Sequence, residues 1–153
     1  MIFVTLGSQK FQFNRLLQVV DNLETDERIF AQIGYSDYKP KNYEFKKFLD
    51  RDEFTNAMDL ADIVITHGGT GAIINAVKKG KKVIAVPRLK KYGEHVDDHQ
   101  IQLLDQFAGL NLIYSCTDCD IQKALNIVKK TTYAKYQSNT DKIIKSLEEF
   151  INE

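Results

Sequence analysis

Short apolar runs alternate with amphipathic stretches along this chain, and this alternation predicts strands separated by helices. The first run, residues 2–6, is rich in β-branched and aromatic side chains, which is typical of a buried strand. Apolar residues then recur at helical spacing over residues 13–23, and a second strand is predicted at 28–33. The segment 34–42 is polar and rich in turn-forming residues, so it is predicted to be a loop.

The remainder of the chain continues the pattern. Further strands are predicted at 44–49, 63–65, 83–86 and 112–114, and further helices at 51–60, 72–79, 97–107, 118–130 and 134–152. Strands that alternate with helices through connections of this length indicate a parallel sheet with helices on both faces. We therefore expect one doubly wound, Rossmann-like α/β domain over residues 1–153.

In a sheet of this kind, ligands bind outside the carboxyl ends of the strands. The loops that begin at Gly7, His67 and Pro87 each follow a predicted strand. We therefore expect these three loops to converge at one edge of the sheet.

Composition narrows the class of protein further. The 153 residues carry 21 basic and 21 acidic side chains, and this zero net charge argues against nucleic-acid binding, which depends on a basic surface. No apolar run approaches the roughly 20 residues of a membrane-spanning helix. The first apolar run has no basic segment before it and the chain has 2 cysteines, so we expect a cytoplasmic protein rather than a secreted disulfide scaffold.

The zero net charge conceals two segments of opposite sign. Residues 78–91 carry only basic charges, and residues 92–120 carry only acidic ones. One interpretation is a set of solvated helix ends and loops. The other is a cationic rim beside the glycine loops that faces phosphates or an anionic membrane surface.

The most informative motif is Thr-His-Gly-Gly-Thr-Gly at residues 66–71, between the clearest strand and a helix. Glycines let a ligand approach the backbone closely, and the N–H groups at the start of the helix favour a phosphate. His67 would donate a hydrogen bond when neutral or offer a charge when protonated, and Thr70 would donate a hydroxyl or cap the helix. The alternative is a tight turn that needs positive φ.

Gly7-Ser8-Gln9 repeats this strand–glycine arrangement after the first strand. Neither the G-x-G-x-x-G dinucleotide fingerprint nor the G-x-x-x-x-G-K-[ST] phosphate loop is present. Their absence argues against an NAD-linked oxidoreductase and a P-loop NTPase.

Two further groups of residues suggest chemistry less strongly. His95 and His99 stand four residues apart, as in zinc-binding helices, but no third ligand is evident. We therefore favour a hydrogen-bonding cluster at a helix start, capped by Asp97 or Asp98, and we predict neither a metal nor a cofactor. The pair at positions 116 and 119, a lone C-x-x-C, is interpreted as two ordinary thiols.

Taken in order, residues 61–71, Gly80, Val86-Pro87 and His99-Gln100 resemble the C-terminal domain of glycosyltransferase family 28. The resemblance covers most of the chain and implies the donor-binding, C-terminal half of a GT-B glycosyltransferase. Residues 3–8 resemble a split version of that fold, in which this half is a separate polypeptide. Residues 87–100 are similar to PssE-type subunits of capsule and exopolysaccharide synthesis.

The resemblance implies a role for both glycine loops at the donor diphosphate. His67 would stabilise the negative charge of the leaving group. The positions that match these two loops are Gly7, Ser8, Gln9, His67, Gly68, Gly69 and Thr70.

The resemblance also implies contacts to the rest of the donor. Phe48 and Leu49 match the positions that hold the uracil ring, and His99 and Gln100 match a polar pair that contacts the sugar. Asn75 stands where the family often has the Glu that binds the ribose hydroxyls. Asn retains hydrogen-bonding capacity but carries no charge.

The implied function is an inverting transfer of a hexose from a UDP-sugar to a lipid-linked acceptor. The resemblance implies that the general base lies largely on a PssD-like, membrane-anchored partner, which would recruit this chain to the inner face of the membrane. One alternative is a non-catalytic nucleotide-binding or regulatory module on a flavodoxin-like sheet. Another is a relative of the UDP-sugar epimerases, which the length disfavours because the chain holds only one half of that architecture.

Overall fold

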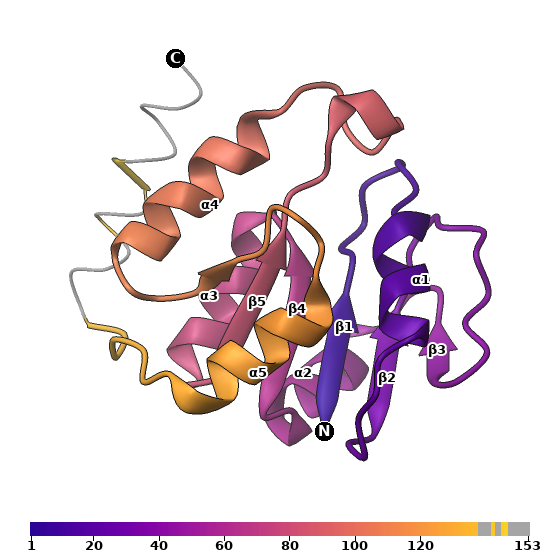
Figure 1. The fold of residues 1–153 in the computed structure, drawn as a ribbon, viewed down its shortest axis with the longest axis horizontal. Coiled ribbons are helices and arrows are strands. Elements are labelled where there is room, and N and C mark those ends of the chain that lie inside the picture. The colour runs from indigo at the N-terminus through magenta and orange to yellow at the C-terminus, as the bar shows by residue number, and fades with distance from the viewer. Residues whose placement is uncertain (138–141, 143–144, 147–153) are drawn as a thin grey trace.

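The computed structural model describes residues 1–137, 142, 145 and 146, and its strands form one parallel sheet (Figure 1). The strand order is β3-β2-β1-β4-β5-β6, and every neighbouring pair is parallel. The order reverses direction between β1 and β4, which is the switch point where such sheets bind ligands. The strands are β1 Ile2–Thr5, β2 Ile29–Gln32, β3 Glu44–Lys46, β4 Ile63–His67, β5 Lys82–Val86 and β6 Tyr114–Ser115. The predicted Rossmann-like class is confirmed.

Helices connect most of the strands at the positions that the apolar spacing predicts. They are α1 Asn14–Asp21, α2 Arg51–Leu60, α3 Thr70–Lys78, α4 His99–Gly109 and α5 Ile121–Lys130, with a short 3-10 helix at Lys90–Tyr92. A reciprocal capping box fixes the start of α2, because Asp50 accepts from the Glu53 N–H while the Glu53 side chain accepts from the Asp50 N–H. Among the described helices, none combines the length and the apolar character needed to cross a membrane.

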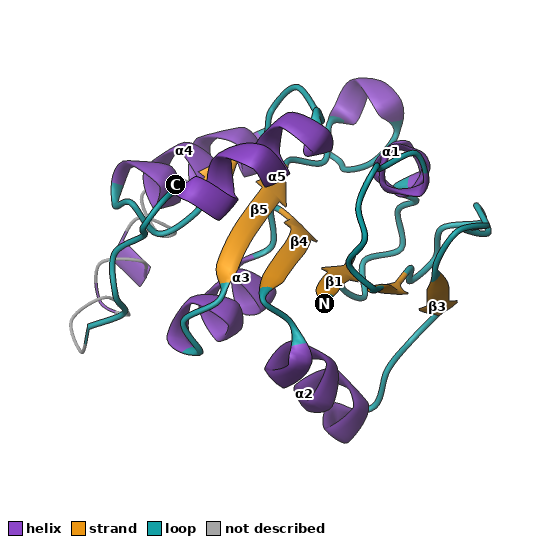
Figure 2. Cartoon of the chain, turned by 60° about the horizontal axis from the view of Figure 1, so that its bottom comes forward, coloured by secondary structure: helices purple, strands orange, loops and turns teal. Residues whose placement is uncertain are grey.

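Alternation along the strands builds two apolar layers. In β1, Ile2 and Val4 pack with α1 and α5, whereas Phe3 packs with α2, α3 and α4 on the other face. Figure 2 shows α1 and α5 above the central strands and α2 and α3 below them. The two layers bury both faces of the sheet, so the carboxyl edge of the strands remains the natural place for a ligand.

The helix predicted at 134–152 is wrong at its start. Residues 134–137 form no regular structure, and most of the remainder lies outside the described residues. The Ala134 N–H donates to the Asn111 carbonyl at 2.8 Å, so a contact with the turn after α4 replaces the first helical turn.

The basic segment 78–91 does not form one rim, so of the two interpretations of this segment, the cationic rim beside the glycine loops is wrong. Its first four lysines lie at the end of α3 and the start of β5, where Lys82 pairs with Ile63 at the amino edge of the sheet. Arg88, Lys90 and Lys91 follow the carboxyl end of β5. Strand β5 spans about 15 Å between the two groups.

Candidate functional site

The loops after β1 and β4 converge on the ring of His67. Gly7 has φ +69°, and a Cβ at this position would lie 2.7 Å from His67 Nε2. A Cβ at Gly69 would lie 2.3 Å from His67 Cε1. The imidazole therefore fills the space that the two glycines leave, and the predicted convergence of these loops is confirmed.

A third glycine loop, after β2, adjoins the first. A Cβ on Gly34 would lie 3.1 Å from the Gly7 carbonyl oxygen, and Gly34 also has positive φ. The next residue, Tyr35, is exposed and makes an edge-to-face contact with exposed Phe48 at 5.1 Å between ring centroids. Leu49, by contrast, packs against the core layer of α2 and α3. Tyr35 was missed from the sequence, although its place after a strand-ending glycine is the same signal that marks the other two loops.

The start of α3 offers backbone donors to an anion. Gly69 occupies the N-cap position and has no side chain with which to cap the helix. Thr70 is the first helical residue, so the alternative role of Thr70 as the cap is wrong. The N–H groups of the first helical turn lack carbonyl acceptors within the helix, and they carry the positive end of its dipole.

His67 is neutral at physiological pH. Its side chain is buried, and burial, reinforced by the charges of Arg88 and His95, lowers its pKa from 6.5 to about 3. Its Nδ1 atom has no hydrogen-bond partner among the described residues. Of the two modes that the sequence left open, the structure therefore favours donation from a neutral ring.

This neutral state predicts a specific acid sensitivity. Between pH 6.5 and about 3 the unfolded chain binds a proton at His67 and the folded chain does not, so stability decreases as the pH decreases through this range. At pH 5 the loss from this residue is about 2 kcal/mol relative to pH 7. Urea unfolding of the parent and of His67→Gln at both pH values measures the difference. An imidazole NMR signal assigned to His67 that titrates near pH 6.5 in the folded chain would contradict the expectation.

Arg88 is buried and ties the first loop to the end of β5. Its guanidinium donates to the carbonyls of Leu6 at 2.8 Å and Phe11 at 2.9 Å, and it lies 5.0 Å from the centre of the Phe13 ring. Desolvation lowers its pKa to about 10, so it remains charged at neutral pH. Arg88 therefore supports the glycine loop from beneath and does not face solvent as a phosphate contact.

Buried Glu94 provides the compensating negative charge. Its carboxylate accepts from Arg15 at 2.9 and 3.1 Å and from the Leu89 N–H at 3.0 Å. Arg15 in turn donates to the Pro87 carbonyl at 3.2 Å. This network holds α1 and the segment after β5 together. No local sequence pattern marks it, because its members are up to 79 residues apart.

Gln100 joins the second glycine loop to the same segment. Its side-chain oxygen accepts from the Gly68 N–H at 3.0 Å and from the Arg88 N–H at 2.8 Å. A Cβ on Gly68 would lie 2.7 Å from the Gln100 Cβ, so the contact needs glycine there. The oxygen is thus occupied by the backbone, whereas neighbouring His99 is exposed at the start of α4. The proposed sugar contact of both residues stays a prediction.

The two histidines flank one carboxylate. Asp97 lies 3.2 Å from His95 Nδ1 and 3.5 Å from His99 Nδ1, and it accepts from the His99 N–H at 3.0 Å. Helix α4 begins at His99, so His95 does not share a helical face with it as the zinc interpretation requires. Asp98 accepts from the Lys90 N–H instead of capping α4 with its side chain. Within the described residues, no group of three or more potential ligands could hold a metal ion.

The C-x-x-C pair has the character of structural thiols. Cys116 and Cys119 are both free and buried. Burial raises both pKa values, and that of Cys116 reaches about 12 with a further contribution from Asp118. Thiols that are protonated and buried are poor nucleophiles.

The remaining predicted binding residues are Ser8 and Gln9, which follow β1, and Asn75, which lies past the middle of α3. Ser8 is exposed and Gln9 is half-buried in the loop after β1. Asn75 lies within α3, and its side-chain oxygen is buried without a hydrogen-bond partner among the described residues. These positions are compatible with ligand contacts, which stay predictions.

The parallel sheet, its switch point and the converging glycine loops define a Rossmann-like domain suited to a phosphate-bearing ligand. The family model for the glycosyltransferase family 28 C-terminal domain matches residues 1–153, so the chain belongs to this family. Its fold is that of the C-terminal half of GT-B glycosyltransferases.

Two relatives are named UDP-N-acetylglucosamine transferase subunit ALG13. The Homo sapiens protein is 28% identical over 127 residues, covering 76% of this chain and 11% of that protein. The Saccharomyces cerevisiae protein is 34% identical over 58 residues, covering 38% and 27% of the two chains. The chain thus spans about a tenth of the human relative and about a quarter of the yeast one.

Solved structures show the same fold at low identity. The NMR structure of an ALG13 has a TM-score of 0.65 and 19% identity, with 99% of this chain and 96% of that chain covered. The calicheamicin glycosyltransferase CalG4 has a TM-score of 0.60 and 16% identity, with coverages of 99% and 38%. Acinetobacter baumannii MurG has a TM-score of 0.55 and 21% identity, with coverages of 84% and 41%.

Proposed function

We propose that this chain is the donor-binding subunit of a two-component, inverting glycosyltransferase that uses a UDP-sugar. The observation that carries the proposal is the convergence of two glycine loops on a buried, neutral histidine beside the uncapped start of α3. Membership of family 28 supports a sugar-nucleotide donor at this edge of the sheet. The relatives are named as a transferase subunit, and this name supports an enzyme composed of two different chains.

The geometry suits departure of a UDP diphosphate. Negative charge builds on the leaving phosphate as the glycosidic bond breaks, and preorganised donors stabilise that charge in the transition state. The first N–H groups of α3 and an N–H of His67 would supply those donors. Gly7 and Gly69 leave the backbone accessible, while Tyr35 and Phe48 would flank the uracil ring. The general base is assigned to the partner half.

The finer features of the proposal rest on the PssE-like segment at 87–100. They are transfer of a hexose to a lipid-linked acceptor in exopolysaccharide or capsule synthesis. The proposed partner is a PssD-like, membrane-anchored subunit, which would bring this otherwise cytoplasmic chain to the inner face of the membrane. The candidate sugars are galactose, glucose, N-acetylglucosamine and glucuronic acid, and the relatives' name supports N-acetylglucosamine.

Titration of the isotope-labelled chain with UDP and UDP-sugars tests the proposal. We expect amide shifts centred on residues 67–70 and on Gly7. Transferase activity should appear only after co-expression with the product of a neighbouring gene, measured against a panel of UDP-sugars. Binding without activity in any complex would favour the non-catalytic module, and no shift at the glycine loops would overturn the donor assignment.

Asn75→Ala should weaken UDP binding roughly tenfold, because the buried amide oxygen would accept a hydrogen bond from a ribose hydroxyl. Calorimetry with UDP and with analogues that lack one ribose hydroxyl measures the effect. The parent should discriminate against the analogue without the contacted hydroxyl, and the variant should not. Equal discrimination by both proteins would place Asn75 away from the ribose.

A further inference from the structure

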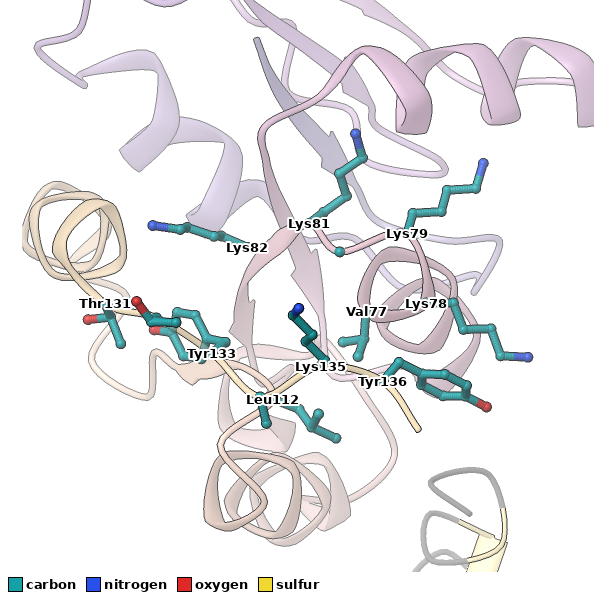
Figure 3. A pocket seen from close by; sticks show the side chains of 13 residues that line it. Val77, Lys78, Lys79, Lys81, Lys82, Leu112, Thr131, Tyr133, Lys135 and Tyr136 are labelled. Atoms are coloured by element: carbon teal, nitrogen blue, oxygen red, sulfur yellow. The ribbon is translucent and has the colours of Figure 1, made fainter. Parts of the chain in front are cut away.

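Lysine side chains surround an open groove of about 580 Å³ at the amino edge of the sheet, and they point in different directions (Figure 3). Lys79 and Lys81 donate to the carboxylate and the carbonyl of Asp59. Lys82 donates to the Val128 carbonyl near the end of α5. These side chains thus contact the fold around the groove, whereas polar side chains that lie together are found at the opposite, carboxyl edge, between β5 and α4.

The segment between β5 and α4 lies beside the loop that follows β1 (Figure 1), and it contains His95. The His95 ring is 5.9 Å from that of Phe11 between centroids. The carbonyls of Phe11 and Glu94 both accept from Arg88 Nη1, at 2.9 and 3.4 Å, which fixes the backbone around this contact. A charge on His95 also contributes to the low pKa of His67. His95 is therefore held beside the donor loops, where it has no assigned role.

Hydrogen bonding decides which nitrogen of His95 is available to a ligand. Nδ1 accepts from the Asp97 N–H at 3.3 Å, so a neutral ring carries its proton on Nε2. The Asp97 carboxylate lies 3.2 Å from the same Nδ1, and 18% of the His95 side chain is exposed. Within the part of the chain that the structure describes, Nε2 has no hydrogen-bond partner. The ring is thus held through one nitrogen and offers an N–H donor at the other.

The order of the strands gives a bound donor its direction along the carboxyl edge. In the proposed function, Tyr35 after β2 and Phe48 after β3 flank the uracil ring, and the diphosphate lies at the loops after β1 and β4. The next strand, β5, lies about 5 Å further along the sheet. The sugar is attached to the distal phosphate, so it would extend toward the segment after β5 that contains His95.

We propose that His95 is a further donor-binding residue that contacts the transferred sugar, with Nε2 donating to one of its hydroxyl oxygens. This inference rests on the proposed function, because the direction of the sugar follows from the donor's place on the sheet. A site that hydrogen-bonds a hydroxyl group of its substrate binds analogues without that group less tightly. UDP has no sugar beyond the diphosphate, so its affinity would be independent of His95.

Calorimetry of the full chain with UDP, UDP-galactose, UDP-glucose, UDP-N-acetylglucosamine and UDP-glucuronic acid tests this contact. His95→Phe retains an aromatic ring against Phe11 but removes both nitrogens, and His95→Gln retains an N–H donor. Val96→Ala is the matched control, because it changes the exposed neighbouring side chain. The imidazole NMR signal of His95 in the parent chain is followed during the same titrations, so one measurement is independent of every variant.

We expect His95→Phe to weaken binding of the preferred UDP-sugar roughly tenfold while UDP affinity is unchanged. His95→Gln should be intermediate, and Val96→Ala should equal the parent. The His95 signal should shift with the UDP-sugar and less with UDP. The inference is overturned if His95→Phe weakens UDP and UDP-sugars equally, if it changes no affinity, or if no UDP-sugar shifts the His95 signal.

The same titrations distinguish failure of this inference from failure of the proposed function. UDP binding at the glycine loops without an effect of His95 would leave the donor proposal standing and overturn only the sugar contact. A parent chain that binds neither UDP nor any UDP-sugar would overturn both.

Discussion

Gly69→Ala should weaken UDP binding by more than about a hundredfold, a loss of roughly 3 kcal/mol. The added Cβ would lie 2.3 Å from His67 Cε1 and 2.8 Å from Nε2, so the imidazole must move. Gly7 closes the opposite side, because a Cβ there would lie 2.7 Å from the same ring. A displaced ring would enter the space that the diphosphate needs, and the methyl group would block the approach to the backbone.

Calorimetry with UDP, together with an amide spectrum to verify folding, measures this effect. Gly109→Ala is the matched control, because a Cβ at the end of α4 meets no atom within 4 Å. The double variant Gly69→Ala/His67→Ala removes the clashing ring. We expect it to regain the stability of His67→Ala while binding UDP weakly. Parent-like UDP affinity in folded Gly69→Ala would show that the donor does not approach this loop.

Arg88→Met should lower the free energy of unfolding by about 3–5 kcal/mol. The substitution retains most of the apolar volume but removes the donors to the Leu6 and Phe11 carbonyls. It also leaves Glu94 with one fewer neighbouring cation, although Arg15 continues to pair with it. The loop after β1 would lose its attachment to the end of β5, so UDP affinity should fall as well.

Urea unfolding and UDP calorimetry on the same samples separate the two effects. Lys90→Met is the control, because it removes an exposed positive charge two residues away. Arg88→Lys retains the charge without the branched donor, and we expect intermediate stability. If Arg88→Met were as stable as Lys90→Met, the buried guanidinium would not support the glycine loop.

Much of the fold follows from local sequence patterns. Helix α2 begins and ends where its pattern predicts, because a capping box and apolar spacing both act within one segment. The strands before Gly7 and His67 were equally evident, because buried parallel strands are short continuous apolar runs. The start of the helix predicted at 134–152 failed, because a hydrogen bond from Ala134 to Asn111 outweighed the local preference.

In the candidate site, too, the features set by local sequence were predicted and those set by long-range contacts were not. The sequence identified the glycine loops, and parallel strand direction was sufficient to bring them to one edge. It also singled out His67, but it left two protonation states open. It grouped Arg88 with the lysines of the basic segment 78–91, because a basic residue among lysines resembles an exposed charge until its burial is known.

The sequence by itself therefore determined a parallel α/β sheet, its glycine loops and a resemblance to family 28, because these are encoded in segments of a few consecutive residues. Tertiary structure decided which groups are buried and what they contact. Burial holds His67 neutral, and partners 77 and 82 residues away make Arg88 a support for the first loop. Strand β5 divides the basic segment between two opposite edges of the sheet. Desolvation and long-range contacts set these properties, and neither can be predicted from the local sequence.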